Sequence, residues 1–454
     1  MKLQVLVAAV VVWFAPVAGS AGQAICAACV RATMSRLAGD DLQGRGCGTP
    51  GEAAAARFIA DSLSRSRITG AFGRDAYVQP VHLETPTAAG PATLSLVWDG
   101  RQVTLTQGRD FVARQLPETL SGPVARVTRA AEVDASLAGK LVILDSAASE
   151  AGPTSAVFKV GALAVIQAAP PSIIARWSEM TASPPGRTVI GGAPAATPRL
   201  DLAIFVTPEA MASLKDVTQG AAVLTAPRGA PRLRTTQSVV GVLHGSAADA
   251  DHRAILLSAH YDHLGVRGGR IFHGANDDAS GTAAVLEFAR FLGSARPRRG
   301  TVYFALFGCE EEGGLAAQYF MAHPPLALDD IAANLEFEMI GVDDPNRPGY
   351  LMLTGFERSN LGPTLQAHGA RIGPDLYPQE NFFHRSDNYQ LALKGVVAHT
   401  VSAWPVPPTY HAVSDTLDHV DLEFMAKVIG SMVEPITWLL DSNFRPAWNP
   451  GQKP

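Results

Sequence analysis

The sequence TVYFALFGCEEEGG at residues 301–314 places three consecutive glutamates directly after an apolar run. Its first eight residues are rich in β-branched and aromatic side chains and predict a buried strand. Glu310, Glu311 and Glu312 therefore lie where this strand ends and a helix begins. Acidic residues favour the first turn of a helix, so they could be solvated there. They could also form a ligand site, because open α/β sheets bind ligands at the carboxyl ends of their strands.

The sequence around this stretch alternates strand-like and helical segments. Strands are predicted at about 254–259, 301–308, 333–341 and 395–401, and helices at about 48–68, 281–292, 314–323 and 421–441. Such alternation is typical of a mostly parallel sheet flanked by helices on both faces. We therefore predict an α/β fold.

The middle of the chain has a different character. At 454 residues the protein is too long for one ordinary core, so two domains are expected. Residues 87–232 contain short β-like runs and no histidine, whereas eleven of the twelve histidines follow residue 243. We interpret 87–232 as a β-rich inserted domain. Residues 22–86 and 233–454 then form one α/β domain that carries the chemistry.

Residues 1–21 have the features of a secretory signal: one lysine, an apolar centre and small residues at the end. A retained membrane anchor is the alternative, which Pro16 and the small-residue exit disfavour. We expect an exported protein, periplasmic or extracellular, without stable membrane insertion. The net charge of −5 and the lack of a basic run argue against nucleic acid as a partner. The oligomeric state is left open.

Three of the four cysteines, Cys26, Cys29 and Cys47, cluster after the signal segment. An oxidising compartment permits a disulfide. A bridge from Cys26 or Cys29 to Cys47 is expected, although sequence spacing cannot choose the pairing. Cys309 is expected to stand alone as a small buried residue.

Histidines and acidic residues recur at the ends of the predicted strands. Each has a simple structural explanation, such as an aspartate that caps a helix. Together they predict a cation, since buried uncompensated carboxylates are costly, and mixed nitrogen and oxygen donors suit zinc. The candidates are His260, Asp262, Asp277, Asp278, Glu310, Glu311, Glu336, Glu338, Tyr410, His411, Asp415 and Asp418.

Five blocks of the sequence resemble the signature of a known enzyme family. SAHYDHLG, GANDDASG, FGCEEEGG, EFEMIG and YHAVSDT are similar, in order and spacing, to the blocks of the two-zinc aminopeptidases, metallopeptidase family twenty-eight. The resemblance covers about 25–84 and 235–454. More loosely, LAGKLVILDS and VGALAVIQ look like the protease-associated domain that some members insert. The resemblance implies a zinc-exopeptidase fold that removes N-terminal residues from peptides.

Carried over block by block, the resemblance implies ligands for two zinc ions. His260 would bind one zinc, and Asp262 would orient the His260 ring from behind. Asp277 would bridge the two ions. Glu311 and His411 would complete the other site.

The resemblance also implies catalytic roles. Glu310 would be the general base that takes a proton from a water shared by the two zinc ions. The Tyr410 hydroxyl is a candidate for stabilising the oxyanion, and Asp415 would support the metal site. Glu312 has no matched role and is expected to be solvated.

One block departs from the family pattern. The family usually has aspartate before MIG, where this chain has Glu338. Glu336 lies two residues earlier and would face the same side of a strand, so both are candidates and Glu338 is favoured. Arg385 and Asp387 are weaker candidates for substrate contact.

Three other functions are compatible with the same blocks. A single-zinc glutaminyl cyclase resembles the fold, but we expect that class to be compact. Carboxypeptidase-type relatives also carry the insertion. A non-catalytic binding protein on a peptidase scaffold is the third alternative, which the intact EEE block and both histidines disfavour. We therefore predict an exported aminopeptidase that acts on peptide substrates with two Zn²⁺ per chain.

Overall fold

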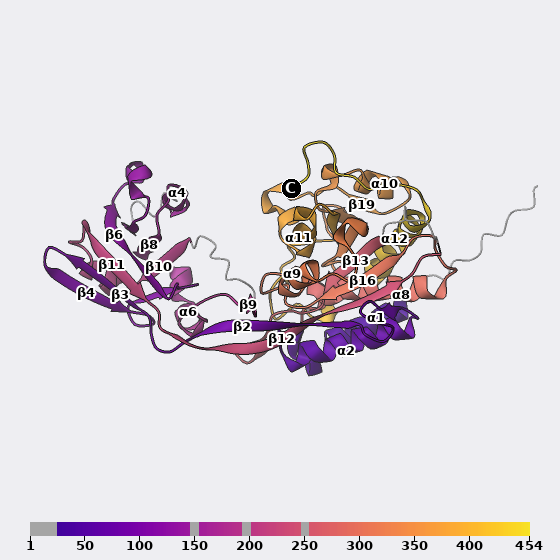
Figure 1. The fold of residues 1–454 in the computed structure, drawn as a ribbon, viewed down its shortest axis with the longest axis horizontal. Helices are drawn as coiled ribbons and strands as arrows, with labels where there is room; N and C mark the ends of the chain where they lie inside the picture. Colours follow the sequence, from indigo (N-terminus) through magenta and orange to yellow (C-terminus); the bar gives the residue numbers. More distant parts are fainter. Residues whose placement is uncertain (1–24, 146–153, 193–200, 247–253) are drawn as a thin grey trace, which may run out of the picture.

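The structure is a computed structural model that describes residues 25–145, 154–192, 201–246 and 254–454. The predicted signal segment 1–21 lies outside the described residues. Figure 1 shows two parts joined by a long pair of strands. Within the described ranges, no helix is both long and apolar enough to cross a bilayer.

The larger part is built on a ten-stranded sheet. Its strand order is β19 (Ile372–Gly373), β18 (Leu351–Leu353), β20 (Val397–Ser402), β17 (Ile331–Phe337), β13 (Ala254–His260), β16 (Val302–Phe307), β12 (Arg228–Leu243), β2 (Val78–Ala88) and β9 (Val189–Ile190), with β1 (Thr69–Gly70) paired to β12. β13 runs parallel to β16 and β17, and β17 runs parallel to β20. The carboxyl ends of these four strands therefore meet at one edge of the sheet.

Helices cover both faces of this sheet, because alternate residues of its strands point to opposite sides. Ile255 and Leu257 of β13 pack into one apolar core, whereas Leu256 packs into another. The first core takes side chains from α1 (Ala27–Leu37), α2 (Pro50–Arg65), α8 (Ser280–Ser294), α10 (Leu361–Ala367) and α12 (Leu422–Asp441), and the second from α9 (Leu315–Ala322) and α11 (Asp387–Leu393). The α/β class with helices on both faces is confirmed.

The predicted helix boundaries have identifiable causes. The Thr49 side chain accepts a hydrogen bond from the Glu52 N–H, so α2 begins at Pro50 as predicted. The Asp421 carboxylate accepts hydrogen bonds from two N–H groups of the first turn of α12. These caps fix the helices that cover the sheet.

The smaller part is an eight-stranded sheet formed by the inserted stretch. Its order is β4 (Arg101–Thr106), β3 (Thr93–Trp98), β11 (Gln219–Thr225), β6 (Thr119–Val127), β7 (Leu141–Leu144), β8 (Ala164–Ala168), β10 (Leu202–Val206) and β5 (Phe111–Ala113). It has an apolar core of its own. Its assignment as a protease-associated domain stays a prediction.

The two parts are joined by β2 and β12, which pair along most of their length. The predicted domain limits, 87 and 232, fall within this pair. β9 comes from the inserted stretch yet pairs with β2 at the edge of the larger sheet. β12, β2 and β9 are antiparallel neighbours, because the chain returns here through the insertion and not through a helical crossover.

The disulfide prediction was wrong. Cys26 bonds to Cys29 within the start of α1, and Cys47 bonds to Cys309. Cys309 is therefore not alone: the turn after β16 lies against the loop that precedes α2, with a Cα–Cα distance of 4.8 Å between the two cysteines. The second bridge joins residues 262 positions apart. It fastens the segment that carries the three glutamates.

Candidate metal centre

The predicted candidates gather at the carboxyl edge of the larger sheet. His260 is the last residue of β13, Glu310 and Glu311 lie in the turn after β16, and Glu338 comes directly after β17. Asp277 lies in the short segment that leads into α8. The parallel pairing of β13 with its two neighbours brings these side chains together.

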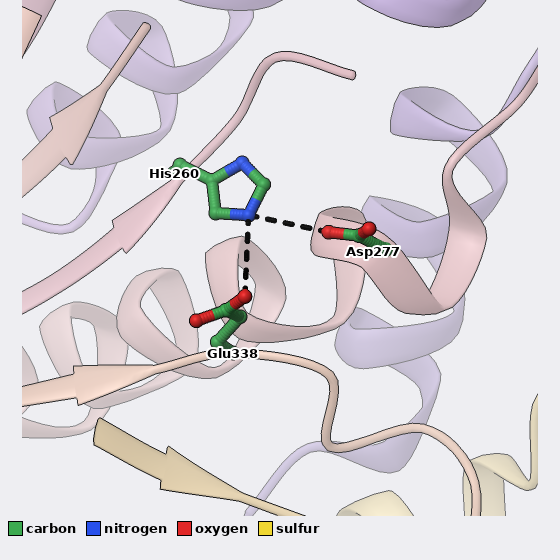
Figure 2. A group of neighbouring side chains, drawn as sticks. All are labelled: His260, Asp277 and Glu338. Atoms are coloured by element: carbon green, nitrogen blue, oxygen red, sulfur yellow. Dashed lines mark ion pairs between the residues drawn. The ribbon is translucent and has the colours of Figure 1, made fainter. Parts of the chain in front are cut away.

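The first group consists of His260, Asp277 and Glu338, whose ligand atoms all lie within 4.8 Å of one another. Nε2 of His260 lies 3.2 Å from Oδ1 of Asp277 and 3.9 Å from Oε1 of Glu338. Figure 2 shows the two carboxylates approaching the same ring nitrogen. Glu336 belongs to neither group, and one of its oxygens is engaged elsewhere: Oε2 accepts hydrogen bonds from the N–H of Asn388 (2.6 Å) and the hydroxyl of Thr400 (3.3 Å).

The second group consists of His263, Asp277 and Glu311, again within 4.8 Å. Nδ1 of His263 lies 2.8 Å from Oε1 of Glu311 and 3.8 Å from Oδ2 of Asp277. Nε2 of His411 approaches the same carboxylates, at 3.2 Å from Oδ2 of Asp277 and 3.1 Å from Oε2 of Glu311. Asp277 therefore turns one oxygen toward each group.

His263 is the residue that sequence reasoning missed. It is buried, and although its Nδ1 lies 2.8 Å from Oε1 of Glu311, neither ring nitrogen has the geometry of a hydrogen bond to a described residue. A signal was available, because His263 is the second histidine of the block SAHYDHLG. A histidine next to a ligand motif is often held by ordinary hydrogen bonds, however, and only the structure shows that this one is not.

The side chains of both groups fit a cation. The ring nitrogens of His260 and His263 and Oε1 of Glu311 are buried and lack hydrogen-bond partners among the described residues. Burial raises the pKa of Glu338 to about 7, against the opposing effect of His260. A cation at this place would favour the charged carboxylates and occupy the free nitrogens. Imidazole and carboxylate donors together are the set that zinc takes in proteins.

The carboxylate that faces both groups favours its charged form. Burial favours the protonated form of Asp277, but the nearby imidazoles of His260 and His411 outweigh it, and the pKa of Asp277 lies below its ordinary value. Its backbone is also held, because Asp415 accepts hydrogen bonds from the N–H groups of Asn276 (2.8 Å) and Asp277 (3.0 Å). Asp415 thus lies where a supporting residue was predicted.

Asp262 holds the turn that carries the glutamates. Its two carboxylate oxygens accept hydrogen bonds from the N–H of Glu310 (2.9 Å) and of Glu311 (3.4 Å). Oδ1 of Asp262 also lies 3.6 Å from Nδ1 of His260, on the ring edge opposite Asp277. One buried carboxylate therefore holds the turn by hydrogen bonds and lies beside the imidazole.

Glu310 lines a hollow next to the first group, with a cavity volume of about 50 Å³. Burial raises the pKa of Glu310 well above its ordinary value. Tyr410 stacks on His411 with 3.9 Å between ring centroids, and its hydroxyl accepts a hydrogen bond of 3.3 Å from Arg385. The hollow is lined by Asp277, Glu310, Glu338, Met339, Met352, Thr354, Phe382, Arg385, Ser386, Thr400, Ser402, Pro405, Tyr410 and His411.

Asp278, Asp387 and Asp418 are among the predicted candidates that lie outside both groups. Asp278 holds the start of α8, since its Oδ1 accepts hydrogen bonds from the N–H groups of Gly281 and Met339. Asp387 is buried, and burial raises its pKa well above the ordinary value. Asp418 is exposed and belongs to neither group.

Glu312 is exposed, as predicted, but it is also bonded to residues from distant parts of the chain. Its side chain is 34% exposed and forms a bidentate salt bridge with Arg234 of β12. It also accepts a hydrogen bond of 2.7 Å from the hydroxyl of Thr188. Burial alone would raise the pKa of Glu312, but the bonds from Arg234 and Thr188 hold it below the ordinary value. The three glutamates therefore point to three different environments.

Comparison with known proteins finds a family match for the segment that forms this edge of the sheet. Residues 238–434 match peptidase family M28. The matched segment contains all residues of both groups. A probable lipoprotein aminopeptidase, LpqL, of Mycobacterium tuberculosis is 30% identical over 186 residues, which cover 33% of this chain and 36% of that protein. The aminopeptidase YwaD of Bacillus subtilis is 27% identical over 198 residues, 42% of each chain.

Solved structures share the fold over a larger part of the chain. An aminopeptidase from Aneurinibacillus sp. strain AM-1 has a TM-score of 0.58 at 20% identity and covers 92% of this chain and 95% of its own. The zinc aminopeptidase BSAP of Bacillus subtilis has a TM-score of 0.54 at 19% identity, with coverage of 92% and 96%. At this identity the likeness shows the fold alone. The chain spans less than half of the length of the two curated relatives named above.

Proposed function

We propose that this protein is a zinc aminopeptidase that hydrolyses the N-terminal residue from peptides with two zinc ions. His260, Asp277 and Glu338 would hold one ion, and Asp277, Glu311 and His411 the other, with His263 as a further donor or as the residue that orients Glu311. The observation that carries the proposal is Asp277, which turns one oxygen toward each group of donors. A carboxylate shared in this way suits a two-metal site.

The residues around this site have separable roles in hydrolysis. Bound zinc supplies a Lewis acid and lowers the pKa of water to about 7. Glu310 takes the proton of the attacking water and gives it to the leaving amine. Its N–H is fixed by Asp262, so the carboxylate is oriented from the backbone. The Tyr410 hydroxyl, beside His411, donates to the oxyanion of the tetrahedral intermediate.

The hollow next to Glu310 suits the side chain of the residue that is removed. Met339, Met352, Phe382 and Pro405 give it apolar walls, while threonine and serine hydroxyls supply polar contacts. The free amino group of the substrate would lie beside Glu338 and the other acidic residues. We therefore infer a preference for substrates with an uncharged, largely apolar N-terminal side chain.

Export and the domain division belong to the same proposal. The two disulfides of the described chain are of the kind that persists in oxidising compartments, which supports export after removal of residues 1–21. Residues 87–232 would be the inserted, protease-associated-like domain, and 22–86 with 233–454 the catalytic one. The separate apolar core of the smaller sheet supports this division.

Two measurements test the proposal: the zinc content of the protein, and its activity on substrates with a free or an acetylated N-terminus. Elemental analysis of the purified protein should give two zinc ions per chain, and His411→Ala should lose one of them. His323→Ala, which changes an exposed histidine at the end of α9, should keep both. The protein should cleave aminoacyl chromogenic substrates and leave their N-acetylated forms intact. One tightly bound zinc at saturation, or cleavage of the acetylated substrates, would contradict the proposal.

A further inference from the structure

The turn that carries Glu310 and Glu311 is fixed at both of its ends. On one side, Cys309 is bonded to Cys47. On the other side, Glu312 is bonded to groups that come from distant parts of the chain. The next two residues are glycines with positive φ, Gly313 at 105° and Gly314 at 69°. Glycine readily adopts such conformations, and the bonds of Glu312, which form an anchor here, are among the contacts that hold this exit in place.

Arg234 of β12 is the centre of this anchor. Its Nη1 donates to Oε1 of Glu312 (2.9 Å) and its Nη2 to Oε2 (2.6 Å), which is the paired geometry that makes arginine–carboxylate bonds strong and directional. The same Nη1 donates to the carbonyl of Cys47 (2.9 Å). The Arg234 side chain is only 12% exposed. The arginine thus links the disulfide at the start of the turn to Glu312 at its end.

The third member of the anchor comes from the inserted stretch. The Thr188 hydroxyl donates to Oε2 of Glu312 (2.7 Å) and accepts from Nη2 of Arg234 (2.9 Å). The Thr85 hydroxyl of β2 lies 3.0 Å from the same Thr188 oxygen. Thr188 directly precedes β9, whose pairing with β2 fixes the position of this residue against the larger sheet. The insertion therefore contacts the glutamate block itself.

We propose that Thr188, Arg234 and Glu312 form a positioning junction through which the inserted stretch holds Glu310 in its working orientation. This inference rests on the proposed role of Glu310 as general base. Thr188 and Arg234 are positioning residues, since they act through Glu312 and not on the substrate. The backbone supports the coupling, because the N–H groups of Gly313 (2.7 Å) and Gly314 (2.9 Å) both donate to the carbonyl of Glu310. A shift of Glu312 is thereby passed to Glu310.

Thr188→Val is the most informative variant, because valine keeps the shape of threonine and removes only the hydroxyl. A misplacement of 1 Å in an active site can lower the rate about 10²-fold. Thr188→Val removes only part of the hydrogen bonds of the junction, so its effect on the rate should be smaller. We expect kcat to fall roughly threefold to tenfold with KM and zinc content unchanged. Glu312→Gln should lower kcat further. The double variant should resemble Glu312→Gln alone, since both changes break the same junction.

Thr207→Val is the matched control within the insertion. Thr207 caps α7 (Pro208–Ser213) by accepting a hydrogen bond from the Ala210 N–H, and its loss should destabilise the insertion without changing kcat. If Thr207→Val lowered kcat as much as Thr188→Val, the effect would be one of general stability and the junction would be refuted. Additive losses in the double variant, or an unchanged kcat in Thr188→Val, would refute it as well.

A second measurement does not depend on activity. Amide hydrogen exchange of residues 308–315 should become faster in Thr188→Val than in the wild type, and should stay unchanged in Thr207→Val. If the wild type cleaved no substrate of the panel, the proposed function would fail, yet the exchange result would still decide the junction. Unchanged exchange in Thr188→Val would overturn it whatever the activity.

Discussion

The two sheets of this protein share a run of parallel strands and differ in the residues at the ends of those strands. In the larger sheet, β16, β13, β17 and β20 are successive parallel neighbours. In the smaller sheet, β6, β7, β8 and β10 are also successive parallel neighbours. Each arrangement brings four carboxyl ends to one edge. Among the described residues, only the larger sheet places both groups of potential ligands there.

The ends of the parallel strands in the smaller sheet are used for structure. Asp145 lies directly after β7 and forms an ion pair with Arg126 of β6. Thr207 lies directly after β10 and caps the next helix. By contrast, His260 and Glu338 end their strands with side chains directed at one another. The comparison teaches that the shared topology provides an edge, and that the residues at the edge decide whether it becomes a site.

The largest expected effect comes from Glu310→Gln. The change keeps the size of the side chain and removes the base, so kcat should fall roughly 10²–10⁴-fold with KM nearly constant. Both zinc ions should remain, because Glu310 belongs to neither group of ligands. Steady-state kinetics with metal analysis of the same preparation checks this. An active variant, or one that has lost metal, would mean that the role of this glutamate is misassigned.

The features that depend on local pattern were predicted from the sequence. Strand and helix positions follow from the spacing of apolar residues, and the predicted helix at 281–292 is α8 in the structure. The gathering of His260, Asp277 and Glu338 follows from parallel pairing, once the strands are known. Asp262 and Asp415 could be placed because each belongs to a sequence block that also carries a histidine proposed as a ligand.

The features that depend on distant pairing were not predicted. The partner of Cys309 is 262 positions away, and nothing in the local sequence selects Cys47. Glu312 looked solvated because Arg234 and Thr188 lie far from it in the sequence. His263 was missed for another reason: its residue type fits either role, and only the absence of hydrogen bonds to its buried ring among the described residues separates them.

The next largest effect should distinguish Glu338 from Glu336. Glu338→Ala removes a donor that faces His260, so we expect zinc affinity at one site to fall by at least about 10²-fold. Such a loss exceeds the one typical of changing a residue that only hydrogen-bonds to a ligand. Glu336→Ala should keep both ions, because Glu336 is bonded to Asn388 and Thr400. Zinc retained at limiting chelator gives the comparison. Loss of a zinc in Glu336→Ala alone would reverse the assignment.

Removal of the insertion should lower kcat but leave the zinc content unchanged. A variant that lacks about 88–232 and has a short linker keeps every proposed ligand, since these lie between 260 and 411. Two zinc ions should therefore remain. We expect kcat to fall by roughly tenfold, within the range for a misplaced catalytic group, because Thr188 is lost. A folded variant without metal would show that the two sheets are not separable as proposed.

The smallest effect should come from Asp145→Asn, at the place in the smaller sheet that corresponds to the acidic strand ends of the larger one. The Asp145 side chain is 34% exposed, so solvent screens its pairing with Arg126, and such pairs contribute about 0–1 kcal/mol to stability. Arg126 keeps other acceptors in the variant, since it also donates to the carbonyls of Val217 and Leu214. Zinc content and kcat should equal those of the wild type, and the midpoint of chemical denaturation should shift little. If Asp145→Asn lowered kcat as Thr188→Val is expected to, the edge of the smaller sheet would take part in catalysis, and the contrast between the two sheets would have to be abandoned.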